Sequence, residues 1–346
     1  MFGLSLFVLA AHVEGQSALP QWTNPQYVGD GWWQSVVADR AGTVHVAWYG
    51  VAPDGNDTLV YAEKPLNGEF TKPLDVIYID STGVTVRNAI DVTSTGTLIA
   101  AYRSNNEHFV AKAPASNADN ARSWQVVRSL STTGYYLNLI VDNKDIIHEV
   151  SAADVILSDT ASVKYEEMRC TICIDLIYKQ SRDGGQTWSE PINLTQTPLS
   201  TSIKPDIWQG KSGRIYVNWD EDTQATVGQK QTYDVRFAYS EDEGKTWSSQ
   251  IILDGGNFND RGPIQLAMTE LFDGSLMAVW RYSGLSDESI YYQTSDDIGK
   301  TWTEPEPIPY LYARSSNDTP FDDYDLITDR TGVVYFFGTG VSAIST

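Results

Sequence analysis

The sequence predicts an all-β fold in which six four-stranded antiparallel blades form a ring, the architecture called a β-propeller. Three observations lead to this prediction: a short motif occurs three times, a strand–turn–strand element occurs six times, and the chain lacks long helical periodicity. The 11 Trp and 19 Tyr among 346 residues are typical of strands. A closed ring can use the whole length, so we expect one propeller domain over residues 19–346.

The repeated motif reads Ser-x-Asp-x-Gly-x-Thr-Trp and occurs at Ser181–Trp188, Ser240–Trp247 and Ser295–Trp302, with a weaker relative at Ser116–Trp124. The interval of roughly 55–60 residues is that of a repeat architecture. Asp and Gly favour turns, and an Asp carboxylate can accept hydrogen bonds from nearby backbone N–H groups. The motif therefore predicts a hairpin turn in which Asp183, Asp242 and Asp297 are structural rather than catalytic.

This motif resembles the Asp-box of the sialidase superfamily, also called the bacterial neuraminidase repeat. The resemblance extends over nearly the whole chain. It implies a six-bladed β-propeller with the boxes on outer hairpins, away from the active site. A shared fold by itself does not imply a shared activity.

A second repeated element precedes each box and consists of an apolar strand, a turn with Gly, and another apolar strand. The copies are Val36–Trp48, Ile90–Tyr102, Leu139–Val150, Ile207–Trp219, Leu266–Trp280 and Leu326–Phe337. In the third copy the turn reads Asp142-Asn143-Lys144-Asp145 in place of a glycine turn. These six copies, each followed by two further strands, give the six expected blades.

The ends of the chain suggest how the ring closes. The segment Gln21–Pro25 resembles the strands after the boxes, Thr187–Pro191 and Thr301–Pro305. We therefore expect the N-terminal segment Trp22–Val28 to supply the outer strand of the last blade, which removes an open sheet edge. Few residues follow Phe337, so this blade is predicted to be incomplete.

The first residues predict a targeting segment. Met1–Val13 is apolar, and small residues at Ser17 and Ala18 offer a cleavage site, so residues 1–18 read as a signal-peptide remnant. The alternative is a short disordered leader. The first interpretation makes the protein secreted, extracellular or periplasmic, and the stretch is too short to span a bilayer comfortably.

The net charge of −21 and the pI near 4.4 exclude a nucleic acid partner, because such a field repels phosphates and anionic membrane surfaces. We expect a monomer without a cofactor or a metal ion. The acidic loop Asp318–Asp323 offers oxygen ligands for calcium, but its spacing matches no metal motif.

The two cysteines, Cys170 and Cys173, lack the further ligands of a zinc site and the βαβ context of a redox motif. A local disulfide and a pair of free thiols are the two alternatives. Both residues lie in an insertion in the third unit, roughly Ala152–Asp175, which is either a binding loop or a variable surface loop.

Aligning the units on their turn glycines brings charged residues into two rings at the opposite strand ends. Seven residues after the glycine stand Tyr49, Arg103, Asp220 and Arg281; nine residues before it stand Trp33, Arg87, Lys204, Gln265 and Asp323. Four cations near one axis predict an anionic ligand, because Arg binds a carboxylate through two parallel hydrogen bonds. The alternative is pairing with the chain's own acids, among them Asp220 and Asp323.

The resemblance implies specific site residues. Sialidases hold the substrate carboxylate with three Arg and use a Tyr nucleophile with its Glu partner and an Asp acid/base. Arg281 matches the second Arg, and Arg314 is the nearest candidate for the third. Tyr324 matches the nucleophile, and Asp54 or Asp57 the acid/base. The first Arg is replaced by the Trp32-Trp33 stretch, and the Glu by Gln265, which cannot act as a base.

Three functions follow as hypotheses. The first is a sialidase-like, exo-acting glycoside hydrolase with an altered site for a terminal acidic sugar, held by Arg281 with Arg87 or Arg103. The second is a non-catalytic propeller that binds a glycan or a protein through the same site, which the loss of the Glu and the first Arg favours. The third is a lyase for uronic-acid polysaccharides, for which His108 and His148 are the available bases.

Overall fold

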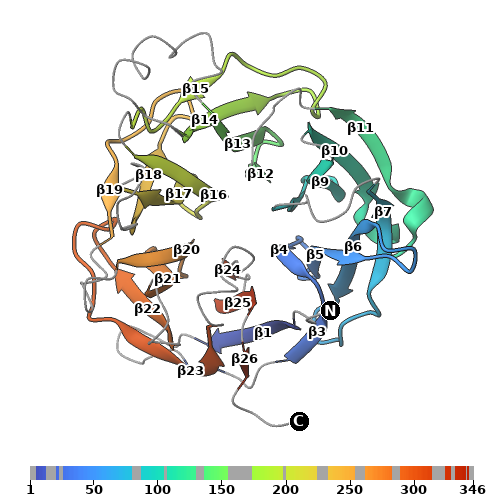
Figure 1. Cartoon of the computed structure of the whole chain (residues 1–346), viewed down its shortest axis with the longest axis horizontal. Helices are drawn as coiled ribbons and strands as arrows, with labels where there is room; N and C mark the ends of the chain where they lie inside the picture. Colours follow the sequence, from blue (N-terminus) through green and yellow to red (C-terminus); the bar gives the residue numbers. More distant parts are fainter. Residues whose placement is uncertain are drawn as a thin grey trace.

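The structure is a computed structural model that describes residues 5–12, 21–22, 26–79, 87–104, 107–129, 136–154, 174–197, 200–223, 233–253, 262–282, 289–313, 324–328, 332–339 and 341–342. Strands arranged as a propeller dominate these residues (Figure 1). The described helical segments are two short 3₁₀ turns, η1 (Ala115–Asn117) and η2 (Ala121–Ser123). No helix in these stretches is long and apolar enough to cross a membrane.

Five blades are antiparallel sheets of strands that follow one another along the chain. Blade 1 has β4 (Trp32–Ala38), β5 (Val44–Val51), β6 (Asp57–Lys64) and β7 (Leu74–Tyr78); blade 2 has β8 (Ala89–Val92), β9 (Thr97–Ser104), β10 (Glu107–Pro114) and β11 (Gln125–Ser129). Blade 3 has β12 (Leu137–Val141), β13 (Ile147–Asp154), β14 (Ile174–Ser181) and β15 (Ile192–Asn193); blade 4 has β16 (Thr201–Gln209), β17 (Ile215–Asp222), β18 (Tyr233–Ser240) and β19 (Ile251–Ile252). Blade 5 has β20 (Pro263–Glu270), β21 (Leu276–Tyr282), β22 (Ser289–Ser295) and β23 (Glu306–Tyr312), and β26 (Val341–Ser342) pairs with its outer edge.

A composite closing sheet fills the remaining sector of the ring (Figure 1). It joins β24 (Tyr324–Thr328) and β25 (Val333–Thr339) to β1 (Ser5–His12), which pairs with β2 (Gln21–Trp22) and β3 (Gln26–Asp30). The prediction of six equivalent blades therefore needs correction: the chain forms five continuous blades and one sheet built from both ends.

The N-terminal strands also differ from the expected arrangement. Strand β1 pairs antiparallel with β25 from Leu6 opposite Thr339 to His12 opposite Val333. The segment expected to add directly to the last blade instead contributes β2 and β3, which both pair with β1. Strand β1 lies within residues 1–18, and the assignment of that stretch as a cleaved leader stays a prediction.

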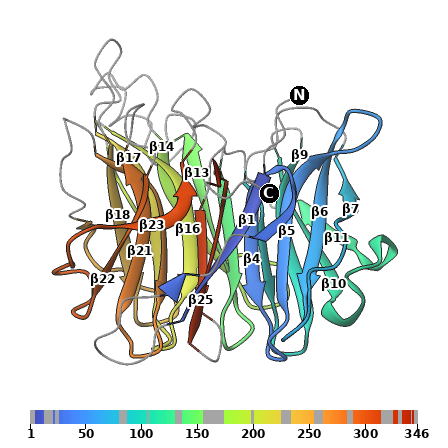
Figure 2. The ribbon, with the colours of Figure 1, turned by 90° about the horizontal axis from the view of Figure 1, so that it is seen from below.

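The strand–turn–strand prediction is confirmed in each unit. The turn glycines have left-handed backbones, for example φ +83° at Gly42 and +85° at Gly213, where a side chain is strained. In the third unit Asp145 adopts φ +61° at the same position, because Asp tolerates this region better than most residues. Figure 2 shows the strands from the side, with hairpins on both faces of the propeller.

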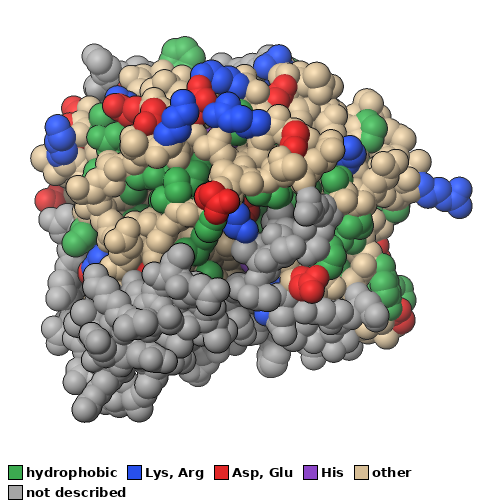
Figure 3. All heavy atoms as spheres, turned by 90° about the horizontal axis from the view of Figure 1, so that it is seen from above, with side chains coloured by type: hydrophobic (Ala, Val, Ile, Leu, Met, Phe, Trp, Pro, Cys, Tyr) green, Lys and Arg blue, Asp and Glu red, His purple; other side chains and the backbone are tan. Residues whose placement is uncertain are grey.

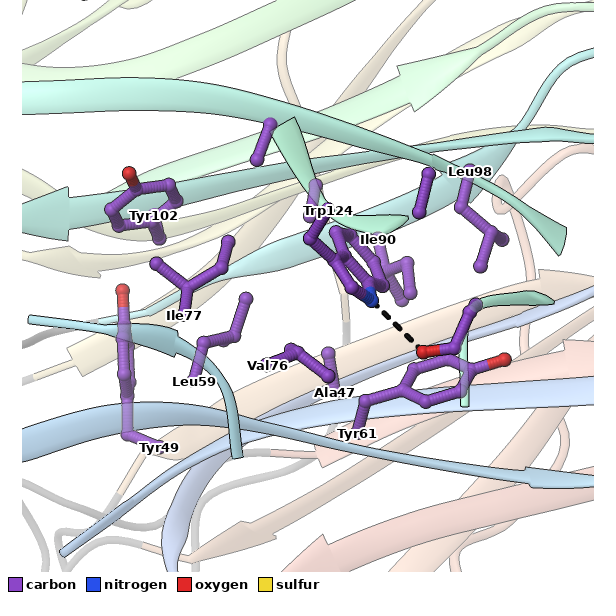
Figure 4. Close-up of a cluster of buried hydrophobic side chains, with 14 of the residues drawn as sticks. Ala47, Tyr49, Leu59, Tyr61, Val76, Ile77, Ile90, Leu98, Tyr102 and Trp124 are labelled. Atoms are coloured by element: carbon purple, nitrogen blue, oxygen red, sulfur yellow. Dashed lines mark hydrogen bonds between the residues drawn. The ribbon is translucent and has the colours of Figure 1, made fainter. Parts of the chain in front are cut away.

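Aromatic and aliphatic side chains pack between neighbouring blades and hold the ring together. Figure 4 shows such a cluster between blades 1 and 2, where Leu59 and Tyr61 pack near Trp124, whose indole N–H donates to the Ala118 carbonyl at 2.9 Å. Burying one such side chain contributes about 1.5–3 kcal/mol. The aromatic residues one position before the second ring are also buried, as expected; they are Trp48, Tyr102, Trp219 and Trp280.

Each blade is also linked to the next by a hydrogen bond; five of these bonds join inner strands, and the sixth joins Asn218 on β17, the second strand of blade 4, to the inner strand β20. We call this set of six contacts the inter-blade belt. It comprises Val36 N to Asp325 at 3.0 Å, Ile90 N to Ser35 at 3.0 Å, Val141 N to Asp91 at 2.6 Å, Asn138 to Asp206, Asn218 to the Leu266 carbonyl at 2.8 Å, and Thr269 with Thr328 at 3.1 Å. The belt continues around the whole ring and includes the closing sheet.

A cavity of about 270 Å³ lies on the axis beside the belt. All six inner strands contribute to its lining, including Ser35, Asp91, Asn138, Asp206, Thr269 and Asp325. None of the predicted site residues lines this cavity, so the candidate site lies elsewhere along the axis.

Candidate functional site

Four residues of the ring nine positions before the turn glycine share an unusual backbone. Their φ angles are +52° at Trp33, +46° at Arg87, +52° at Lys204 and +60° at Gln265. In β4, β16 and β20 the strand register shifts at this point, which identifies a bulge. A non-glycine residue in this region costs on the order of 1–3 kcal/mol. Arg87 lies just before β8, which pairs with β9 without a register shift, so it shares the left-handed φ but not a recorded bulge. The strained backbone sets the direction of one side chain at each of these four positions.

These left-handed residues bring side chains from different blades together. The Lys204 ammonium lies 5.6 Å from the Trp33 ring centroid, although the residues belong to blades 4 and 1. Arg87, before blade 2, donates a hydrogen bond to the Pro205 carbonyl of blade 4. The sequence rings therefore do converge near the axis, and their side chains are buried.

Asp220 compensates part of this positive charge. It is buried, and its carboxylate accepts a hydrogen bond from the Gln265 backbone N–H at 2.8 Å. Burial raises the pKa of Asp220, while the charges of Lys204 and Arg87 act in the opposite direction. Asp220 therefore offsets part of the charge of Lys204 and Arg87, and a bound anion at these cations stays a prediction.

Tyr49 connects Arg103 to Arg87. The Tyr49 hydroxyl donates to the Arg87 carbonyl at 2.9 Å and accepts from the Arg103 backbone N–H at 2.9 Å. Burial raises the pKa of Tyr49, and the Arg103 charge opposes this shift. Tyr49 thus holds the two arginine backbones in fixed relative positions.

Arg281 has a different environment from the other cations. It is fully buried, its Nε donates to the Gln265 Oε1, and its Nη1 donates to the Tyr282 carbonyl at 3.3 Å. Among the residues that the structure describes, its Nη2 has no hydrogen-bond partner. The ion pairs found among the described residues do not include Arg281. A buried guanidinium without a carboxylate is costly and calls for an anionic partner.

The predicted acid/base residues do not join the cation cluster in the contacts seen. Asp54 lies on the exposed β5–β6 turn, where the Asn56 N–H at 3.1 Å and the Tyr78 hydroxyl at 3.0 Å lower the pKa of its carboxyl group. A general acid needs the opposite shift. Asp57 is 2% exposed at the start of β6, and its charge raises the pKa of Tyr49.

Tyr324 starts β24 and is 2% exposed. Its ring packs edge-on against Phe336 with centroids 5.3 Å apart, inside the cluster between blade 5 and the closing sheet. Asp323 and Arg314, together with Cys170, Cys173 and the acidic loop Asp318–Asp323, lie outside the described residues.

The Asp-box prediction is confirmed in atomic detail. In the first box, Asp183 accepts from the Thr187 N–H at 2.8 Å and hydroxyl at 2.6 Å, and Ser181 accepts from the Gly185 N–H at 3.0 Å. These bonds lower the pKa of Asp183 to about 2. The same contacts occur around Asp242 and Asp297.

The boxes lie on the outer face and carry ion pairs. Glu243 of the second box contacts Lys144 and pairs with Arg182 at 2.9 Å, which links blades 3 and 4. Figure 3 shows Lys, Arg, Asp and Glu side chains intermingled over one outer side of the ring. Such exposed pairs contribute little stability individually.

Two buried histidines have structural contacts that the sequence analysis did not predict. His148 is fully buried, its Nδ1 lies 2.6 Å from the Tyr178 hydroxyl, and its Nε2 lies 3.3 Å from Asp142. His45 has the same contacts with Tyr61 and Asp39. The repeated Asp-x5-His spacing was the available signal. His108 is also fully buried, so neither proposed lyase base is exposed.

No group of three or more His, Cys, Asp or Glu side chains suited to a metal ion occurs in the stretches that the structure describes.

Comparison with known proteins adds to this geometry. Residues 160–320 match the model of the BNR repeat-like domain. Residues of this chain are also 29% identical over 145 positions to a curated sialidase of Clostridium perfringens, a match that covers 39% of this chain and 35% of that enzyme. These two matches support a sialidase-like propeller of BNR repeats, in agreement with the resemblance seen in the motifs. The chain spans about a third of the length of that curated sialidase.

Solved structures with the same fold include an ulvan lyase, a polysaccharide lyase, at 12% identity and a TM-score of 0.57 over 84% of this chain and 73% of that one. They also include the α-L-arabinofuranosidase of Fusarium graminearum at 10% identity and a TM-score of 0.57, over 90% and 92% of the two chains. At these identities the likeness establishes the fold alone.

Proposed function

We propose that this chain is a secreted sialidase-like propeller in which Arg281, with Arg87 or Arg103, holds the carboxylate of an acidic sugar. It acts on acidic glycans as an exo-acting glycoside hydrolase with a non-standard site. The observation that carries the proposal is Arg281, a fully buried guanidinium with one nitrogen lacking a partner. An anionic group is the ligand that best compensates it.

The second candidate is a non-catalytic glycan- or protein-binding propeller that uses the same cluster. Gln265 stands where the resemblance expects a base, and Tyr324 packs in the core beside Phe336. The hydrogen bonds to Asp54 also favour its ionised form. These three observations favour binding over turnover.

The test measures chromophore release from a panel of acidic glycosides, α-sialosides first, with Arg281→Ala as the control for the cluster. The hydrolase predicts turnover that Arg281→Ala lowers by more than tenfold, because the buried anion contact is worth at least about 1.4 kcal/mol. Substitution of Asp54 or Asp57 by Asn then tests the proton donor.

The binding candidate predicts no release but calorimetric binding of N-acetylneuraminate or glucuronate that Arg281→Ala abolishes. Unsaturated products that absorb in the ultraviolet would instead identify a lyase. A folded wild-type protein that neither cleaves the glycosides nor binds the acids would refute the proposal in both forms.

A further inference from the structure

The cavity of about 270 Å³ on the axis, here called the axial cavity, lies closer to the turn glycines than the residues of the candidate site do. In blade 4 its lining consists of residues 206–211, which follow Lys204 along the strand. In blade 5 the lining begins at Thr269, four positions after Gln265. Because a strand rises about 3.3 Å per residue, the axial cavity and the candidate site lie at different depths along the axis.

The wall of the axial cavity is built from strand edges. Each inner strand is the terminal strand of its sheet and contributes to the lining, and Figure 1 shows these strands around the axis. A strand edge carries a row of N–H and C=O groups. Side chains of neighbouring sheets bind some of them, as Asp325 binds the Val36 N–H and Asp91 binds the Val141 N–H. The wall therefore has polar groups on every side of the axis.

Carboxyl groups from four different sheets add acceptors to this wall. They belong to Asp91, Asp206, Glu270 and Asp325. An ionised carboxylate accepts a stronger hydrogen bond from a hydroxyl group than a neutral acceptor does. Burial raises the pKa of Asp91 to about 7, so near neutral pH this carboxyl group is able to donate as well as accept. Such a set suits a ligand that has several hydroxyl groups pointing in different directions.

The charge of the lining argues against two other classes of ligand. Lys211 is the one basic residue in the described lining, and its ammonium lies 4.1 Å from the ring centroid of Phe272. An anion would therefore meet an excess of carboxyl groups. A metal ion needs ligands that converge on one point, and the described residues contain no group of three or more side chains suited to one.

An indole provides the axial cavity with an apolar surface. Trp208 lines the cavity, Tyr216 stacks on it with ring centroids 4.1 Å apart, and its N–H donates to Asn218 at 3.1 Å. The indole is therefore fixed in place. A flat aromatic surface can pack against the C–H face of a sugar ring while the hydroxyl groups of the sugar bond elsewhere. The volume is close to the lower limit of small-molecule sites, about 300 Å³, so it suits one sugar residue rather than a chain.

We propose that the axial cavity binds a single non-acidic sugar residue, with its hydroxyl groups on the carboxyl groups and strand edges and its ring against Trp208. The ligand is either a free monosaccharide or the terminal residue of a glycan, since both present the same ring. This inference goes beyond the proposed function, because it does not require Arg281 to bind an acid. All six sheets line the cavity, so a bound sugar should also stabilise the closed ring.

The experiment is calorimetric titration of the full chain with the methyl glycosides of galactose, glucose, mannose and N-acetylglucosamine at millimolar concentrations. We expect at least one of them to bind and to raise the thermal midpoint. Excess N-acetylneuraminate should not displace it, because the acid is excluded from the axial cavity. A disaccharide that ends in the same sugar should bind equally well if the natural ligand is a glycan, and more weakly if it is a free monosaccharide.

Two variants locate the bound sugar. Asp206→Asn removes a charge but keeps an oxygen for the Asn138 amide, and Glu270→Gln keeps an oxygen for the Ser212 hydroxyl. Each should lower the affinity for the sugar by at least about fivefold, because a charge-assisted hydrogen bond becomes a neutral one. The sugar should also raise the thermal midpoint of each variant less than that of the wild type, measured from its own value without sugar.

The matched control is Asp234→Asn, the same change in the same blade as Asp206. Asp234 accepts from Arg236 at 3.2 Å and lies outside the lining of the axial cavity. This variant should bind the sugar as the wild type does.

The outcomes have distinct meanings. Sugar binding that both lining variants weaken and Asp234→Asn leaves unchanged supports the inference. No binding of any methyl glycoside overturns it, as does binding that neither lining variant weakens or that N-acetylneuraminate abolishes. Binding of putrescine without binding of a sugar would also overturn it and would identify a site for an organic cation. The proposed function is tested separately, by the response of acid binding and turnover to Arg281→Ala.

Discussion

Glu149 should make the stability of the propeller depend on pH in an unusual direction. It lies in the middle of β13 and is 1% exposed, and neither carboxylate oxygen has a hydrogen-bond partner within the described part of the chain. Burial raises the pKa of Glu149 from 4.5 to about 7, although the charge of Lys179 across β14 and the nearby Ser151 hydroxyl oppose the shift. Ser151 is close but not in bonding geometry.

The sign of the effect follows from proton binding. The folded state holds the Glu149 proton more tightly than the unfolded state, so folding is favoured at low pH and loses free energy as pH rises from 4.5 to about 7. A shift of about 2.5 pH units corresponds to about 3 kcal/mol at pH 8. Glu149→Gln removes this loss because the amide does not ionise.

The expected result is a pH-dependent gap between the two proteins. With an unfolding entropy of about 2.1 cal/mol/K per residue, about 3 kcal/mol raises the thermal midpoint of Glu149→Gln by roughly 4 °C at pH 8. At pH 4 the midpoints should be nearly equal.

Near-ultraviolet circular dichroism at pH 4, 6 and 8 measures the thermal midpoints. Glu190→Gln, an exposed position in the same blade, is the control for loss of one negative charge. A gap between wild type and Glu149→Gln that stays constant over this range would refute the reasoning.

Two further predictions test the backbone and the belt. Gly244 and Gly213 have φ of +80° and +85°, but a Cβ on Gly244 would lie 1.9 Å from the Tyr178 hydroxyl, whereas nothing lies within 4 Å at Gly213. Gly213→Ala should cost about 1–2 kcal/mol from strain alone and Gly244→Ala clearly more; equal midpoints in thermal unfolding would contradict this. Ser35→Ala leaves the Ile90 N–H without its acceptor and should cost about 1–3 kcal/mol in denaturant unfolding. A cost below the measurement error would show that the belt contact is replaced by water.

The sequence was most informative where a local pattern has one physical solution. Ser181, Asp183 and Thr187 are close in the chain, so their spacing alone predicts the hydrogen-bonded turn that the structure contains. The turn at Asp145 was predicted in the same way, from its place in the repeat.

The site was predicted less well because it depends on contacts between distant blades. Aligning the repeats brought Arg87 and Lys204 to one ring and their acid partner Asp220 to the other, but it did not predict the left-handed backbone that sets the direction of Arg87 and Lys204. The pairing of β1 with β25 joins the two ends of the chain, and no local pattern specifies such a partner.

At the four left-handed positions the direction of the side chain is set independently of which residue stands there. Nearly the same φ occurs at Trp33, Arg87, Lys204 and Gln265, which carry an indole, a guanidinium, an ammonium and an amide. The backbone therefore sets the direction of the side chain, and the residue type sets only its chemistry. The four positions therefore act as equivalent backbone sites around one axis, each able to present a different side chain. A substitution at one of them changes the charge presented to a ligand while the strands of the propeller keep their arrangement.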